Sequence, residues 1–138
     1  MTRLDVDAFQ IRLQTAILGR RIETHDSLPS TQDVARDHAA RSATTPDGAV
    51  FATEFQTRGR GRHDRAWSSP PGANLLFSAV LCPRARIARP TLITLALGGA
   101  VRSAAAAIAA VDAVATWPHD VFLDGRKAAG ARPEVGHR

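Results

Sequence analysis

The chain has 138 residues, which is the size of one domain and is long enough to bury a core. Its hydrophobic content of 44% and charged content of 22% are ordinary for a globular protein, and the lone Cys82 excludes an internal disulfide framework or a multi-cysteine metal site. The formal net charge of +5 comes from arginine, with Lys127 as the one lysine, and it favours an anionic ligand or a nucleic acid.

The N-terminus and the hydropathy pattern indicate the cellular compartment in which the protein is expected. Residues 1–10 include Asp5 and Asp7 and contain no apolar run, so no signal peptide is expected. No stretch has the 18 or so consecutive apolar residues that are typical of a membrane span. Together with the single cysteine, these features predict a cytoplasmic protein that does not cross a membrane.

The first part of the chain predicts two helices separated by a strand. Apolar residues at helical spacing indicate a short amphipathic helix over 5–18, and 22–25 is expected to form a brief strand. Ser30 followed by Asp33 has the pattern of a capping box, so a second helix should begin there and continue to about residue 41. Its expected buried residues are Val34 and Ala35.

A basic loop lies between two predicted strands. After a turn over 44–48, the β-branched and aromatic segment 49–55 predicts a strand, and the apolar run 74–81 predicts the most buried strand of the chain. The segment 58–67, which is rich in arginine and glycine, connects them. Connections of this kind often carry binding groups.

The C-terminal half predicts a long helix and a hairpin. The alanine-rich segment 91–111 predicts a helix whose alanines pack on a core, although it contains an adjacent pair of glycines. A short strand is expected at 114–116. Asp124 and Gly125, between the apolar stretches of 120–129, are a strong signal for a two-residue hairpin turn.

Helices and strands are therefore interspersed along the chain. This order predicts an α+β protein with a mixed, largely antiparallel sheet and helices packed on one face. Residues 131–138 are polar and without pattern, so a poorly ordered tail is expected there.

Five motifs follow one another in a fixed order. They are Ser30-Thr31-Gln32, Glu54-Phe55-Gln56, Gly59-Arg60-Gly61-Arg62-His63-Asp64-Arg65-Ala66-Trp67, Trp117-Pro118-His119-Asp120 and Asp124-Gly125-Arg126-Lys127-Ala128-Ala129-Gly130. Their order and spacing resemble the catalytic domain of the biotin protein ligases. That family carries S-T-N, a glutamine before G-R-G-R-x-x-R-x-W, then K-W-P-N-D and G-R-K-x-A-G.

The resemblance covers residues 20–130 and only the first part of the family domain. It implies a fold like that of the biotin and lipoate protein ligases and the class II aminoacyl-tRNA synthetases. Residues 1–138 would then form a single partial catalytic domain, truncated before the remaining strands and the small C-terminal barrel of the family. No counterpart of the DNA-binding helix-turn-helix of some members is recognisable.

The resemblance implies a two-step reaction that uses ATP and Mg²⁺. Biotin's carboxylate attacks the α-phosphate of ATP, which gives biotinyl-adenylate and pyrophosphate. A lysine amine in the biotin carboxyl carrier domain of a biotin-dependent carboxylase then attacks the adenylate. Neither step needs a protein nucleophile, but both need anions that are held in line and neutralised. A homodimer remains an open alternative to a monomer.

The resemblance also assigns roles to individual residues. The implied biotin-binding residues are Ser30, Thr31, Gln32, Gln56, Arg60, Gly61, Arg62 and Thr116. The implied ATP-binding residues are Gly59, Arg65, Trp67, His119, Asp120 and Lys127. The implied catalytic residues are Arg60, Arg62 and Arg65. No protein ligand for a metal is expected.

Three positions depart from the family pattern. Gln32 replaces an asparagine, which is a mild change, and His119 replaces the asparagine of K-W-P-N-D. Thr116 stands where the family has the lysine that meets the reacting carboxylate and phosphate. Loss of one transition-state donor slows a reaction by about 10²–10³, so slow adenylation is expected.

Three other functions are compatible with parts of the sequence. A lipoate–protein ligase shares the implied fold, but the arginine-glycine motif favours biotin. A non-catalytic module that holds biotin or biotinyl-adenylate, or that pairs with another polypeptide, is favoured by Thr116 and by the shortness of the chain. A nucleic-acid binder is supported only by the net charge, because aromatic residues for base stacking are lacking.

Overall fold

The chain separates into two compact units, Met1–Arg84 with Gly136–Arg138 and Ala85–Val135. The structure is a computed structural model that describes residues 4–41, 46–63, 65–83, 89–109 and 111–136. Parts of four predicted features lie outside these ranges, namely loop residues 44–45, motif residue Asp64, residue 110 of the predicted helix 91–111 and tail residues 137–138.

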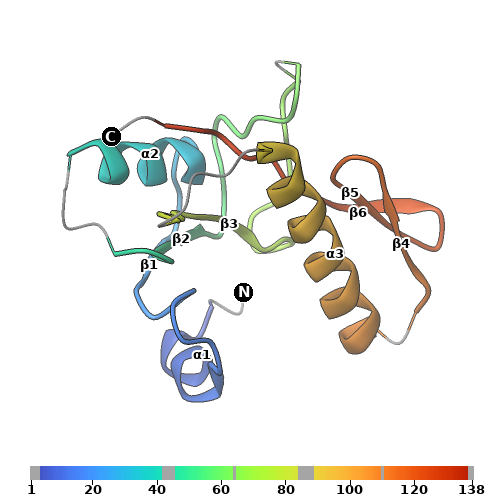
Figure 1. Ribbon diagram of the computed structural model, residues 1–138, viewed down its shortest axis with the longest axis horizontal. Helices are drawn as coiled ribbons and strands as arrows, with labels where there is room; N and C mark the ends of the chain where they lie inside the picture. Colours follow the sequence, from blue (N-terminus) through green and yellow to red (C-terminus); the bar gives the residue numbers. More distant parts are fainter. Residues whose placement is uncertain (1–3, 42–45, 64, 84–88, 110, 137–138) are drawn as a thin grey trace. The chain divides into compact units, whose positions relative to one another are not determined.

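The first unit contains a three-stranded mixed sheet covered by one helix. Its elements are α1 (Val6–Arg12), β1 (Ile22–His25), α2 (Thr31–Arg41), β2 (Val50–Thr53) and β3 (Leu76–Ala79). The strand order is β1-β2-β3, with β1 parallel and β3 antiparallel to β2. Figure 1 shows α2 lying against this sheet. The strand predicted at 22–25 is confirmed.

The core of this unit lies between α2 and the sheet. Phe51 of β2 is 1% exposed and packs with Ala35 of α2 and with Ala49 and Val80. The centroids of the His38 and Phe51 rings lie 4.7 Å apart, so the His38 ring packs against this core residue. Burial of one such phenylalanine contributes about 1.5–3 kcal/mol, so Phe51 anchors α2 on the sheet.

The prediction that 74–81 is the most buried strand is wrong. Leu76 and Val80 are buried, whereas Leu75 is 69% and Phe77 49% exposed. Successive side chains of a strand point to opposite faces, and α2 covers only one face of β3. The apolar run is therefore half exposed in this chain.

The first helix is shorter than its apolar spacing predicts. Asp5 caps α1 by accepting a hydrogen bond from the Ala8 N–H at 2.9 Å, and the backbone becomes extended at Leu13. Gly19, at a φ of +79°, then turns the chain, and its N–H donates to the Gly48 carbonyl. This turn, fixed by a contact distant in sequence, replaces the last predicted helical turn and leaves Ile17 54% exposed.

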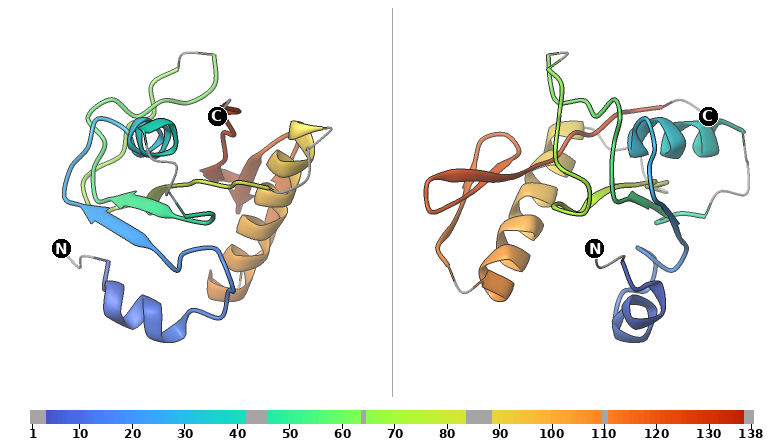
Figure 2. Two further views of the ribbon diagram at one scale, coloured as in Figure 1. Left: turned by 60° about the vertical axis from the view of Figure 1, so that its left-hand side comes forward. Right: turned by 180° about the vertical axis from the view of Figure 1, so that it is seen from behind.

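The second unit consists of a helix and an antiparallel meander. Its elements are α3 (Pro90–Ala109), β4 (Ala113–Thr116), β5 (Asp120–Leu123) and β6 (Arg126–Gly130), with the strand order β4-β5-β6. Helix α3 runs beside β4 (Figure 2). The predicted hairpin turn is confirmed, since Asp124 and Gly125 both have positive φ, at 47° and 74°. A cis peptide bond joins Trp117 to Pro118 between β4 and β5.

Helix α3 buries less surface than predicted. Thr94 is buried, and a Cβ added to Gly98 would lie 3.8 Å from His119, but most of the alanine run is exposed. The exposed large apolar residues of the helix are Leu92, Leu95, Leu97 and Ile108. The prediction that the alanines pack on a core is therefore wrong within this chain.

The same helix corrects the hydropathy reading of the sequence. By length and composition alone, Thr91–Ala109 is apolar enough to cross a membrane, although no such segment was expected. A helix that is covered by further protein passes the same test, so this property alone assigns no membrane role. The α+β class with mixed and antiparallel strands is confirmed, with the strands arranged in two sheets.

Candidate functional site

The start of α2 carries a buried polar network. Ser30 and Thr31 are 3% and 4% exposed. The Thr31 N–H donates to Gln56 Oε1 at 2.8 Å, and the Thr31 hydroxyl donates to the same oxygen at 3.2 Å. Two motifs that are distant in sequence, Ser30-Thr31-Gln32 and Gln56, are thus brought together as predicted.

Ser78 of β3 extends this network and was missed by sequence reasoning. Its Oγ lies 2.9 Å from the Thr31 hydroxyl, and it donates to Gln32 Oε1 at 3.0 Å. Ser78 pairs with Phe51 across the sheet, so its side chain points to the face that α2 covers. A polar residue within an apolar strand was the signal that could have indicated it. The side chains of Thr31, Gln32, Gln56 and Ser78 thus form one connected polar network at the start of α2.

The backbone after β2 is fixed by the segment before α2. Leu28 and Gln56 form a parallel bridge. The Thr57 N–H donates to the Leu28 carbonyl and the Arg58 N–H to the Pro29 carbonyl, both at 2.9 Å. These contacts hold Gln56 beside Thr31 and fix where the arginine-glycine loop begins.

The arginine-glycine loop is a small hairpin. Arg60 and Ala66 form an antiparallel bridge, and the Gly61 N–H donates to the Arg65 carbonyl at 2.7 Å. The Trp67 N–H closes the base of the hairpin by donating to the Gly59 carbonyl at 2.8 Å. Arg62 and Arg65 are exposed near its tip, and Trp67 is half-buried. The loop therefore presents cations on a defined backbone.

Gly59 is required at the base of this hairpin. A Cβ at this position would lie 2.4 Å from the Trp67 carbonyl oxygen and 3.0 Å from the Gln56 side-chain nitrogen. Since the first neighbour is backbone, relief of the overlap would require the hairpin to open, whereas a Cβ at Gly61 would lie 3.4 Å from its nearest neighbour.

We expect Gly59→Ala to lower the free energy of unfolding by about 1–3 kcal/mol, while Gly61→Ala changes it by less than about 0.5 kcal/mol. Urea unfolding of both variants, followed by circular dichroism, measures the difference. Equal stability of the two variants would contradict the close packing of Gly59 against Trp67.

A two-point ion pair joins the loop to α2. The Arg60 guanidinium donates to Asp33 Oδ1 at 2.6 Å and to Oδ2 at 3.2 Å, and Arg36 donates to the same carboxylate. Asp33 was predicted as the second half of a capping box. Both oxygens of its carboxylate instead accept hydrogen bonds from arginine side chains. The hydrogen bond from Arg60 holds the pKa of Asp33 below its ordinary value of 3.8. Because this folded-state pKa is depressed, the stabilisation is complete above pH 3.8 and is lost as the pH falls through the lowered value.

The remaining predicted site residues lie in the second unit. Thr116 at the end of β4 is exposed and pairs directly with Asp120 of β5. The Lys127 ammonium lies 2.8 Å from Asp120 Oδ2, and His119 Nδ1 lies 2.7 Å from Oδ1 without the alignment of a hydrogen bond. Burial raises the pKa of Asp120, but Lys127 and then His119 outweigh it and the pKa is lowered.

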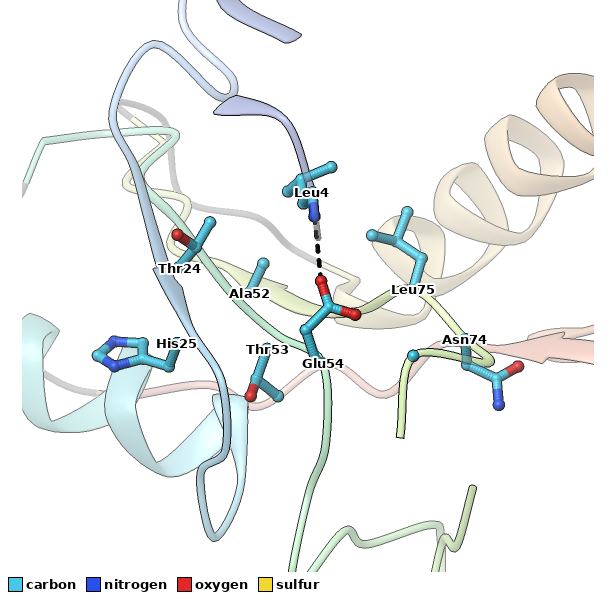
Figure 3. Close-up of a pocket in the computed structure, with 9 residues that line it drawn as sticks. Leu4, Thr24, His25, Ala52, Thr53, Glu54, Asn74 and Leu75 are labelled. Atoms are coloured by element: carbon cyan, nitrogen blue, oxygen red, sulfur yellow. Dashed lines mark hydrogen bonds between the residues drawn. The ribbon is translucent and has the colours of Figure 1, made fainter. Parts of the chain in front are cut away.

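A separate pocket lies on the face of the first sheet that α2 does not cover. Ala52, which alternates with Phe51 along β2, contributes to its wall, and the Leu4 N–H donates to Glu54 Oε1 at 3.0 Å (Figure 3). The described residues that line it include none of the predicted site residues. Its volume of about 170 Å³ is below the roughly 300–1,000 Å³ of typical ligand pockets. The buried network is therefore the better candidate site.

Fold and site together define an α+β domain with a buried polar network and an arginine-rich hairpin loop. The sequence profile described as "Biotin/lipoate A/B protein ligase family" matches residues 25–135. The chain belongs to this family, whose members are ligases, and its relatives and structural neighbours are biotin protein ligases.

Two curated relatives illustrate the similarity. The chain is 30% identical over 133 residues to the bifunctional ligase/repressor BirA of Bacillus subtilis, covering 96% of this chain and 40% of that protein. It is 33% identical over 139 residues to the biotin–[acetyl-CoA-carboxylase] ligase of Mycobacterium tuberculosis, covering 96% and 52%. The chain thus spans about half the length of these relatives.

Solved structures show the same similarity. The biotin protein ligase of Aquifex aeolicus in complex with biotin and ATP superposes with a TM-score of 0.72 at 28% identity, covering 84% of this chain and 47% of that chain. The biotin protein ligase of Leishmania major in complex with biotin gives 0.70 at 25% identity, covering 85% and 52%.

Proposed function

We propose that this chain is the biotin-binding part of an ATP-dependent biotin–protein ligase. The proposal rests on the convergence of Thr31, Gln56 and Ser78 on one buried network, while Arg60 of the arginine-glycine loop pairs with Asp33 on the first turn of α2. The network suits a small polar head group, and the guanidinium suits the carboxylate or phosphate at the other end of the ligand.

The proposed chemistry needs positioning and charge more than a protein nucleophile. A biotin carboxylate oxygen forms a bond to the α-phosphorus of ATP, and the bond to the β-phosphate oxygen breaks to release pyrophosphate. A lysine amine then displaces AMP and forms an amide. Arg60, Arg62 and Arg65 would hold the anions in line and neutralise them. The nucleotide would be bound by Trp67, His119, Asp120 and Lys127.

Mg²⁺ would enter with the nucleotide. Among the described residues, no group of three or more His, Cys, Asp or Glu side chains could hold a metal ion. Asp120 is already contacted by the Lys127 ammonium. Magnesium commonly takes most of its ligands from phosphates and water, where it would neutralise the phosphate charge. We therefore propose that magnesium arrives bound to ATP, with phosphate and water as its main ligands.

The proposed acceptor is a lysine of a biotin carboxyl carrier domain. The support is the name of the Mycobacterium tuberculosis relative, which is a biotin–[acetyl-CoA-carboxylase] ligase. The repressor activity in the name of the Bacillus subtilis relative is a property of that protein.

A second candidate function is the binding of biotin or biotinyl-adenylate without turnover. It is favoured by Thr116, an exposed neutral residue at the position of the family lysine. A threonine hydroxyl has no charge and a short stem, so it cannot replace an ammonium between two anions.

Calorimetric titration of the chain with biotin and with lipoate tests the ligand class. We expect biotin to bind more tightly. Gln56→Glu keeps the oxygen that Thr31 needs but removes the amide donor, and it should weaken biotin binding by about 10–100-fold. Gln14→Ala, at an exposed position outside the network, is the control and should bind as the parent chain does. A preference for lipoate would move the assignment within the family, and no binding of either ligand would contradict the proposal.

A further inference from the structure

Asp33 is the residue through which α2 contacts the arginine-glycine loop. Its carboxylate receives two N–H groups of Arg60, which is 27 residues further along the chain, and one from Arg36 a turn along the helix. The Asp33 side chain is 25% exposed, so the pair is partly shielded from solvent. Asp33 lies two residues after Thr31 at the start of α2, so the ion pair attaches the guanidinium to the helical turn that also carries Thr31 of the polar network.

The geometry of the pair is compatible with simultaneous ligand contact. A guanidinium presents five N–H donors in a planar fork, and the contact with Asp33 engages two of them. Arg36 shares the carboxylate, so the three side chains together keep a net positive charge. Pairing with Asp33 and contacting an anion therefore do not exclude each other.

We propose that Asp33 is a positioning residue, which holds the Arg60 side chain in place for the anionic end of biotin or biotinyl-adenylate. This inference rests on the proposed function. An arginine side chain loses rotamer freedom when it binds a ligand, and each side chain that is immobilised in this way weakens binding. With Asp33 present, Arg60 is already ordered before the ligand arrives, so this loss occurs on folding.

The same pair orders the loop relative to the head-group network. The base of the hairpin is fixed by Arg58 and Trp67 through backbone hydrogen bonds, and the Arg60–Asp33 contact adds a side-chain link to α2. The distance between the head-group site and the cation is then set before binding. A ligand with its polar head and its anion at that separation is favoured over a shorter or longer one.

The test is a double-mutant cycle in calorimetric titrations of the full chain with biotin. Asp33→Asn should weaken binding by about two- to tenfold, and Asp33→Glu should restore part of the affinity. In the Arg60→Ala background the same Asp33→Asn change should have no further effect, because the side chain that it positions is gone. Biotinamide, which lacks the carboxylate, should be bound almost equally by the parent and by Asp33→Asn.

Asp37→Asn is the matched control. Asp37 lies one helical turn further along α2, is 57% exposed and pairs only locally with Arg41 among the described contacts. It should leave biotin affinity unchanged. Melting curves of every variant separate a loss of fold from a loss of positioning.

Two outcomes contradict different claims. If the parent chain binds biotin and Asp33→Asn binds it equally well, or if the effects of Asp33→Asn and Arg60→Ala are additive, the positioning role of Asp33 is wrong. If the parent chain binds neither biotin nor biotinamide, the proposed function is wrong instead.

Discussion

Thr116→Lys is expected to raise the rate of biotinyl-adenylate formation by about 10²–10³. The resemblance places a lysine here, where the carboxylate and the α-phosphate approach each other. Two anions repel, and the repulsion is poorly screened where water is excluded. A lysine ammonium offsets this repulsion, whereas the threonine hydroxyl does not.

The second unit indicates why Lys127 does not already supply this charge. Its ammonium lies 2.8 Å from Asp120, the direct strand partner of Thr116. A lysine whose charge is matched by a carboxylate contributes less to neutralising a second anion. Biotin affinity should survive in the parent chain, because the head-group contacts belong to the first unit, while adenylation is slow.

The assay is pyrophosphate release with biotin and ATP, in a chain fused after Val135 to the remaining part of the Mycobacterium tuberculosis relative. Ala115→Lys is the matched control, because it adds the same charge one residue earlier, on the opposite face of β4. Equal rates for Thr116→Lys and its parent would show that Thr116 does not occupy the position of the family lysine. The alignment of Trp117-Pro118-His119-Asp120 would then be wrong as well.

Arg62→Gly is expected to shorten the retention of biotinyl-adenylate by about 10–100-fold. Arg62 is exposed near the tip of the hairpin, and its carbonyl accepts a hydrogen bond from the Arg65 N–H at 3.2 Å. The charge-assisted hydrogen bond that we propose between its guanidinium and the adenylate phosphate would be lost. Released adenylate is reactive, so lysines of unrelated proteins should become labelled.

Labelling of a bystander protein such as serum albumin, in the same fused chain, measures this release. Arg58→Gly is the control, since Arg58 is an exposed arginine at the base of the loop whose backbone N–H, retained by glycine, contacts Pro29. It should label the bystander no more than the parent does. If Arg62→Gly also leaves bystander labelling unchanged, Arg62 does not retain the adenylate.

Local signals in the sequence predicted local structure well. The strand at Ile22–His25 and the turn at Asp124 and Gly125 are where the pattern placed them. Both features depend on the residues within them. The strand contains β-branched side chains, and the turn contains two residues that adopt a positive φ. The ordered motifs likewise predicted the family, because each motif is short and contiguous.

Two features that depend on distant contacts were not predicted. The link from Ser78 to Thr31 and the pair of Asp33 with Arg60 join residues 47 and 27 positions apart. The capping-box pattern predicted that the Asp33 carboxylate would accept a hydrogen bond from a backbone N–H at the start of the helix. In the structure this carboxylate pairs with the Arg60 guanidinium instead. Sequence periodicity does not indicate such competition.

Burial was overestimated for the same reason. The apolar pattern of α3 and β3 specifies a face that is suited to burial, but not what covers it. Phe77 remains 49% and Leu92 56% exposed in this chain. The chain spans about half the length of its curated relatives.

A titration of the isotope-labelled chain with biotin, followed by nuclear magnetic resonance, locates the binding site residue by residue. We expect the signals of the Thr31 backbone amide and the Gln56 side-chain amide to change most, because both groups belong to the proposed head-group network. Arg60 should respond through its guanidinium. Changes confined to Leu4, Glu54 and Leu75, which line the pocket on the other face of the sheet, would contradict the proposed site.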